Sequence, residues 1–123
     1  MIRIYISGKR LNEYLDELNK DPEKYAEKFA IAENGLMEAG IPHEYIINPI
    51  KFGFSDNDIW TDMFKIYIDA INKCDAIYML RDWKSSLIAR NELTIAGKNR
   101  KTIYFEENND IGMIRDCITS KII

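Results

Sequence analysis

The sequence predicts an α/β fold of three layers, in which helices cover both faces of a parallel sheet of four to five strands. Short apolar runs with the composition of strands alternate with longer segments whose apolar residues recur at helical spacing. Strands that are separated by helices form parallel sheets through right-handed crossovers. No internal repeat, low-complexity tract or linker interrupts the 123 residues, so we expect one domain over residues 1–123.

The first strand and the first helix have clear boundaries in the sequence. The strand covers Ile2–Ser7, is rich in β-branched residues and stops at Gly8. After a charged connector, Asp21 and Pro22 predict a helix start, because Asp caps a first turn well and Pro fits its first position. We expect this helix to end at Gly40.

A second, short strand is predicted at Glu44–Asn48, where Pro49 ends it. The next helix should begin near Asp58. Its apolar stripe includes Trp60 and Tyr67 and is wide enough to suggest contact with the sheet and with a second surface.

The remaining elements complete an arrangement of the flavodoxin- or Rossmann-like kind. They are a strand at Ala76–Leu80, a helix at Ser86–Lys98, a strand at Thr102–Phe105 and a helix at Ile111–Ser120. In such sheets ligands bind beyond the carboxyl ends of the strands. Those ends are Ser7-Gly8, Asn48-Pro49, Leu80 to Trp83, and Glu106, and we expect the functional site there.

Composition and motifs exclude several classes of function. With 46% apolar residues, 30% charged residues and a net charge of -3, the chain has no basic footprint for nucleic acid or anionic lipid. No apolar run could span a membrane and the first residues lack a signal-peptide pattern, so we expect a cytoplasmic protein. Cys74 and Cys117 form no CxxC pair, His43 is the single histidine, and no nucleotide-phosphate loop follows Gly8. We therefore expect no metal and no organic cofactor.

Glu92 is a carboxylate in an unexpected place. The residues at helical spacing from it, Ala89 and Ala96, are small and should face the sheet, which would bury Glu92 beside them. Burying a carboxylate without partners costs several kcal/mol, so it should be either used or satisfied there. The alternative is a partly exposed helix residue paired with Arg90, Lys98 or a neighbouring residue.

Six short pieces of the sequence follow one another in an informative order. They are Tyr5-Ile6-Ser7-Gly8, Asn48-Pro49, Trp60 with Asp62 and Met63, Cys74 to Leu80, Trp83 with Ser86, and Ala89-Arg90-x-Glu92-x-x-x-Ala96. In this order and spacing they resemble the nucleoside 2-deoxyribosyltransferase-like superfamily, most closely a branch of small bacterial and phage proteins within it. The resemblance covers most of the chain and implies a homodimer or a larger homo-oligomer.

The resemblance implies that Glu92 is a catalytic nucleophile. In characterised relatives the matching glutamate attacks the anomeric carbon of a deoxyribosyl group, expels the base and forms a glycosyl-enzyme ester. Relatives that hydrolyse 5′-monophosphates carry Ser at the position of Ser86, six residues earlier, and a helix N-terminus with a hydroxyl suits a phosphate. The resemblance therefore implies an N-glycosidase or transglycosidase that acts on a (deoxy)nucleoside 5′-monophosphate.

Other residues of the six pieces are expected to contact this small-molecule substrate. They are Tyr5, Ser7, Gly8, Asn48, Trp83, Ser86 and Ala89, with Trp83 placed to stack on the base. Simpler interpretations stay open for three of them: Tyr5 as a core residue, Ser86 as an ordinary helix cap and Trp83 as an exposed loop aromatic.

Two departures from the pattern of the active relatives leave other functions open. Tyr67 stands where they carry Asp, eight residues before Asp75, and Ile88 stands where they carry Gly. An alternative function is therefore a nucleotide-binding module without turnover. A third is an interaction protein in which the apolar second helix builds an oligomer.

Overall fold

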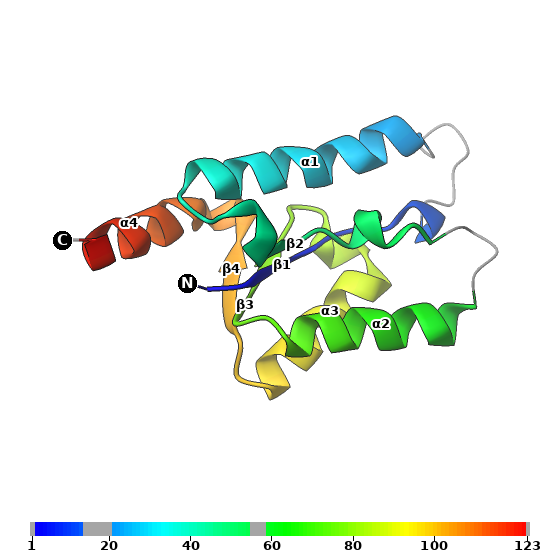
Figure 1. The fold of residues 1–123 in the computed structure, drawn as a ribbon. Coiled ribbons are helices and arrows are strands. Elements are labelled where there is room, and N and C mark those ends of the chain that lie inside the picture. The colour runs from blue at the N-terminus through cyan, green and yellow to red at the C-terminus, as the bar shows by residue number, and fades with distance from the viewer. Residues whose placement is uncertain (1, 14–20, 55–58, 123) are drawn as a thin grey trace.

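A computed structural model describes residues 2–13, 21–54 and 59–122, and in this part of the chain the predicted three-layer α/β/α fold is confirmed (Figure 1). The strands are β1 (Ile4–Ser7), β2 (Ile46–Ile47), β3 (Ala76–Met79) and β4 (Thr102–Phe105). They form a four-stranded sheet in the order β2-β1-β3-β4, and every neighbouring pair is parallel. This order is that of flavodoxin-like sheets, in which the chain leaves β1 toward one edge and later returns past it.

Helices cover both faces of the sheet. The α-helices are α1 (Pro22–Glu38), α2 (Trp60–Asn72), α3 (Leu87–Lys98) and α4 (Ile111–Ile122). Short 3-10 helices are η1 (Leu11–Glu13), η3 (His43–Tyr45), η4 (Pro49–Phe52), η5 (Trp83–Ser85) and η6 (Glu106–Asn108). Figure 1 shows α1 and α4 on one side of the sheet and α2 and α3 on the other. Within the described ranges, none of the helices combines the length and the apolar character that crossing a membrane requires.

The first helix begins where the sequence predicted and ends at Glu38, slightly before the predicted Gly40. Asp21 caps α1, because its carboxylate accepts hydrogen bonds from the backbone N–H groups of Glu23 and Lys24 at 3.0 and 3.4 Å. Pro22 occupies the first position, where no backbone donor is needed. After the helix, Gly40 has a φ of +112°, a conformation that residues with a Cβ rarely adopt.

The second strand is shorter than predicted. The sequence predicted Glu44–Asn48, but Glu44 lies in η3 and only Ile46 and Ile47 pair with β1. Asn48 instead begins η4, and its side chain accepts a hydrogen bond from the backbone N–H of Ile50 at 3.1 Å. Local side-chain hydrogen bonding of this kind competes with strand pairing. The predicted start of the next helix, near Asp58, lies outside the described residues, and α2 is described from Trp60.

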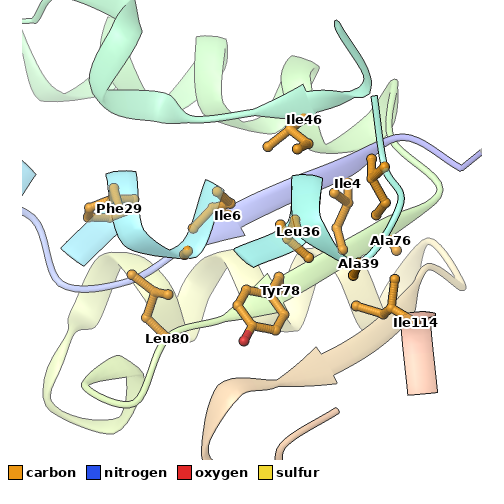
Figure 2. Packing of buried hydrophobic residues seen from close by; sticks show 12 residues of the cluster. Ile4, Ile6, Phe29, Leu36, Ala39, Ile46, Ala76, Tyr78, Leu80 and Ile114 are labelled. Carbon is orange, nitrogen blue, oxygen red and sulfur yellow. The ribbon is translucent and has the colours of Figure 1, made fainter. Parts of the chain in front are cut away.

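Alternate residues of the strands face opposite helix layers. Ile4 and Ile6 pack with α1 and α4 residues in the cluster of Figure 2, which joins Phe29, Leu36 and Ile114. Tyr5 belongs to the other cluster, which contains Ala89 and Ala96 of α3. Because side chains alternate along a strand, Ser7 faces the same layer as Tyr5. The carboxyl end of β1 therefore presents two hydroxyl groups toward α3.

Candidate functional site

The structure buries Glu92 completely on the sheet-facing side of α3. Its side chain is 0% exposed, as are Ala89 and Ala96 on the same side of the helix. The burial predicted from the small residues around Glu92 is thus confirmed. The alternative was wrong: Arg90 and Lys98 are exposed, and neither is among the donors found at the Glu92 carboxylate.

Among the described residues, three side chains hydrogen-bond to the Glu92 carboxylate. The Tyr5 hydroxyl donates to Oε2, and the Ser7 hydroxyl donates to Oε1 at 2.7 Å. Arg10 Nη2 donates to Oε1 at 2.8 Å and to Oε2 at 2.9 Å. Each oxygen therefore accepts two hydrogen bonds, which occupies the roughly four lone-pair positions of a carboxylate. The buried Glu92 carboxylate thus has a cation beside it and hydrogen-bond donors for both of its oxygens.

Arg10 is a residue of the candidate site that sequence reasoning missed. Its side chain is 3% exposed, and Nη1 donates to the Gly8 carbonyl at 2.5 Å. The guanidinium carbon lies 4.7 Å from the ring centre of Tyr67 and 5.7 Å from that of Phe29. Aromatic faces stabilise a cation in this position. One signal was available: a buried carboxylate needs a cation, and Arg10 is the second residue after the glycine that ends the first strand.

The two groups that flank Glu92 keep their protons. Burial raises the pKa of the Tyr5 hydroxyl well above its ordinary value, and the nearby Glu92 carboxylate raises it further. Burial by itself lowers the pKa of Arg10, but the Glu92 carboxylate and the Tyr5 and Tyr67 hydroxyls shift it back, and the net pKa is raised. Tyr5 is therefore a hydrogen-bond donor and Arg10 a cation at neutral pH.

A second carboxylate occupies the N-terminus of α3. Ser86 caps this helix, since its hydroxyl oxygen accepts from the backbone N–H of Ala89 at 2.9 Å. The same hydroxyl donates to Glu13 Oε2 at 2.6 Å, and the backbone N–H of Ile88 donates to Glu13 Oε1 at 3.0 Å. An anion is stabilised at a helix N-terminus. In this structure the anion is the side chain of Glu13.

Backbone contacts hold the segment that carries Arg10 and Glu13. The backbone N–H of Arg10 donates to Glu13 Oε2 at 2.8 Å, and that of Lys9 donates to Asp82 Oδ1 at 3.0 Å. Lys28 of α1 donates to the Lys9 carbonyl at 2.7 Å and pairs with the Asp82 carboxylate. The segment thus lies across the carboxyl ends of β1 and β3.

The predicted substrate residues fall into two groups. Tyr5, Ser7, Gly8, Ser86 and Ala89 lie together around Glu92, Arg10 and Glu13. Gly8 is needed for this packing, because a Cβ there would approach Leu80 Cδ1 to 2.8 Å.

Trp83 and Asn48 form contacts elsewhere. The Trp83 indole N–H donates to Glu107 at 3.1 Å, and its ring centre lies 5.6 Å from that of Phe105, on the β4 side. The Asn48 amide donates to Glu33 of α1 at 3.2 Å. Ile46 packs with α1, so strand alternation directs Asn48 to that face and away from Glu92.

Tyr67 and Ile88 are the two residues that depart from the sequence pattern described above, and they pack in one cluster. Both are 4% exposed and belong to a small apolar cluster with Met63. Burial raises the pKa of the Tyr67 hydroxyl. Tyr67 thus places an aromatic ring over Arg10, the cation that neutralises Glu92.

The residues that hold Glu92 do not line the cavity found in the described structure. That cavity, of about 330 Å³, lies between η4 and α2 and is lined by residues such as Ile47, Phe52, Ile66 and Ala70. Among the side chains that the structure describes, no group of three His, Cys, Asp or Glu residues is placed to hold a metal ion.

Comparison with known proteins places the chain in a family without naming an activity. No curated protein is similar enough to the sequence to count as a match. The sequence pattern of a family described as a domain of unknown function, DUF4406, matches residues 2–105, a span that includes β1 to β4 and the residues around Glu92. The chain therefore belongs to the DUF4406 family.

Proposed function

We propose that the protein is an N-glycosidase or transglycosidase that cleaves the N-glycosidic bond of a (deoxy)nucleoside 5′-monophosphate. The observation that carries this proposal is the position of Glu92: a fully buried carboxylate at the carboxyl end of a parallel sheet, held by hydroxyl donors from β1. This edge is where such sheets bind ligands. The resemblance of the surrounding motifs to the deoxyribosyltransferase-like superfamily supports the same chemistry.

The reaction would proceed in two displacements at the anomeric carbon. A Glu92 oxygen forms a bond to the anomeric carbon as the bond between this carbon and the base nitrogen breaks. The electron pair of the broken bond stays with the departing base, which also takes up a proton from solvent. Water or a second base then attacks the ester, releases the sugar phosphate or a new nucleotide, and restores the carboxylate. Tyr5 and Ser7 position Glu92, whose negative charge stabilises the oxocarbenium-like transition state.

The N-terminus of α3 supports a phosphorylated substrate. The Ser86 hydroxyl and the Ile88 backbone N–H converge on one carboxylate here, and both are donors of the kind that bind phosphate oxygens. A substrate whose 5′-phosphate took this place would have its sugar near Glu92, about one and two-thirds helical turns beyond Ser86 along α3. This placement favours a nucleotide over an uncharged nucleoside.

A nucleotide-binding module without turnover is the second candidate. It is favoured by the four hydrogen bonds at Glu92, which leave no lone pair of the carboxylate for attack in this conformation. The ring of Tyr67 over Arg10 stabilises the partner of Glu92 in that state. Such a module would bind nucleotides at the same edge of the sheet and release no base.

The decisive experiment measures free base. The protein is incubated with each common nucleoside and deoxynucleoside 5′-monophosphate, and released base is quantified by chromatography. We expect release from at least one nucleotide and a loss of about a thousandfold or more in Glu92→Gln, which keeps the shape of the side chain but cannot form the ester. Glu27→Gln, at an exposed position of α1, is the matched control.

Each outcome assigns the protein to one of the candidates. Base release that is unchanged in Glu92→Gln, or no release from any nucleotide, contradicts the enzymatic proposal. Calorimetric binding of a nucleotide without base release would assign the binding module. Trapping a sugar phosphate on the peptide that contains Glu92, detected by mass spectrometry, would identify the nucleophile directly.

We also propose that the protein acts in the cytoplasm as a homodimer or a larger homo-oligomer. The apolar side chains of Ile59 and Ile66, at the start of and within α2, are 66% and 43% exposed, which supports a contact with another copy. Light scattering at micromolar concentration should give a mass of at least twice 14.4 kDa. A monomer in that measurement would contradict the oligomer.

A further inference from the structure

One short segment fills both ends of the candidate site. Arg10 places a guanidinium on Glu92, and Glu13, three residues later, places a carboxylate on the N-terminal donors of α3. In the proposed reaction the first position belongs to the sugar, which becomes cationic in the transition state, and the second belongs to the 5′-phosphate. The segment thus places a cation where the sugar of a bound nucleotide would become positive, and an anion where the phosphate of that nucleotide would lie.

Of the three donors to Glu92, Arg10 is the one that can leave. Tyr5 and Ser7 lie within β1, which pairs with β3 over its whole length. Arg10 lies beyond the end of that strand. Withdrawal of Arg10 frees one lone-pair position on each carboxylate oxygen, whereas Tyr5 and Ser7 can still hold the side chain in place.

Within the described residues, the closed arrangement leaves one buried polar side-chain atom without a partner. This atom is Arg10 Nε, which finds no hydrogen-bond acceptor there although the side chain is 3% exposed. A buried donor without an acceptor is unfavourable, because in water it would be hydrogen-bonded. The contacts at the two ends of the segment therefore stabilise the closed state, and the buried donor without an acceptor destabilises it. Opening removes this unfavourable contribution.

Arg10 and Glu13 are coupled to each other. The backbone N–H of Arg10 donates to the same Glu13 oxygen that accepts from Ser86. A ligand that takes the place of the Glu13 carboxylate therefore also removes a contact that orients the backbone of Arg10. A phosphate monoester is suited to this exchange, because it carries up to two negative charges and three acceptor oxygens, whereas Glu13 carries one charge.

We infer that the segment Arg10–Glu13 is an autoinhibitory latch that occupies the site and is displaced by the phosphate group of the substrate. The inference rests on the proposed function of the site, and it adds how that site is regulated. With Glu13 in place, hydrogen bonds occupy all lone pairs of the Glu92 carboxylate, and the carboxylate cannot attack a substrate. With a phosphate in place of Glu13, Arg10 leaves Glu92 and the carboxylate can attack.

The first test compares the affinity of the protein for inorganic phosphate by calorimetry. Glu13→Gln keeps the size of the side chain and removes the charge that competes with phosphate. We expect phosphate to bind Glu13→Gln about tenfold more tightly than the wild type, because the binding-competent open state is more populated. Glu27→Gln removes the same charge from an exposed position of α1 and should leave the affinity unchanged. Equal or weaker binding to Glu13→Gln, or no phosphate binding to either protein, would overturn the latch.

A second test needs no variant of the segment. Hydrogen exchange of the wild type is followed by mass spectrometry with and without saturating phosphate, in peptides that cover residues 9–13. The amide of Arg10 is hydrogen-bonded to Glu13 in the closed state, so phosphate should accelerate exchange in this peptide. Unchanged or slower exchange would contradict displacement of the segment.

The latch and the proposed reaction can fail separately. Tighter phosphate binding by Glu13→Gln without base release would support the latch and contradict the catalytic proposal. Base release together with an unchanged phosphate affinity in Glu13→Gln would support the catalytic proposal and contradict the latch.

Discussion

The Arg10 guanidinium uses a single nitrogen to contact both oxygens of the Glu92 carboxylate, at 2.8 and 2.9 Å. Both side chains are shielded from solvent, with 3% and 0% exposure. The pair joins the segment after β1 to α3 across 82 positions of sequence. It is the ion pair that neutralises the buried carboxylate of the candidate site.

Replacing Arg10 should destabilise the fold strongly. Arg10→Ala would leave the Glu92 carboxylate buried without its cation, which typically costs about 3–5 kcal/mol of unfolding free energy. Urea denaturation at pH 7 measures the change. Arg81→Ala is the matched control, because this arginine is 71% exposed and its contact with Glu106 is long, at 3.8 Å. We expect the control to change stability by no more than about 0.5 kcal/mol.

A double variant separates the charge from the packing. In Arg10→Leu/Glu92→Leu both buried charges are absent, and an apolar pair of similar volume is often as stable as the ion pair that it replaces. We expect part of the stability lost in Arg10→Ala to return, because the charges are gone but the buried Tyr5 and Ser7 hydroxyls lose their acceptor. A double variant as unstable as the single one would show that the ion pair is not the source of the loss.

Two glycines should respond in opposite directions to alanine. A Cβ at Gly8 would lie 2.8 Å from Leu80 Cδ1 and 3.1 Å from Leu80 Cβ, so Gly8→Ala must displace a buried core residue. Overpacking of this kind costs about 1–3 kcal/mol. Gly97, near the end of α3, has no neighbouring atom within 4 Å of the added Cβ. Gly97→Ala should therefore gain about 0.5–1 kcal/mol, and equal shifts in the two thermal melting temperatures would refute this assignment.

The two cysteines should react at very different rates. Cys74 is 2% exposed, and burial raises the pKa of its thiol to about 11, so little thiolate forms at pH 8. Cys117 is exposed. A disulfide reagent should label one thiol per chain quickly and the second only after unfolding in guanidinium. Cys117→Ser should remove the fast phase, and a fast phase that survived would place the reactive thiol at Cys74.

The protein should lose stability in alkaline solution. Burial raises the pKa of Tyr25 and of Tyr78 to about 12, from an ordinary value of 10.0 in the unfolded chain. Between these values the folded state retains protons that the unfolded state has released, so the free energy of unfolding falls as the pH rises. This contribution is complete below about pH 10 and is lost toward pH 12.

Urea midpoints at pH 8, 10 and 11 measure this dependence. Tyr78→Phe removes one of the hydroxyls whose pKa is raised by burial, so the decline between pH 10 and 11 should be shallower in this variant. A wild-type midpoint that does not move over this range, or a decline equally steep in Tyr78→Phe, would contradict the assignment.

Much of the fold was predictable because its signals are local. Asp21 and Pro22 begin α1, and Ser86 caps α3, by contacts that span only a few residues. The spacing of Ala89, Glu92 and Ala96 likewise predicted that the carboxylate faces the sheet. The two-residue length of β2 was missed, because Asn48 forms a local turn where the composition favoured a strand.

The amino-acid sequence by itself determined the order of strands and helices and the burial of Glu92, since helical periodicity and caps depend on near neighbours. Only the tertiary structure decided what satisfies that carboxylate. Arg10 reaches Glu92 because parallel pairing of β1 with β3 brings the end of the first strand beside the helix that follows the third. Sequence spacing does not fix such a contact, because the distance between the two residues is set by the packing of the sheet and not by the chain that connects them.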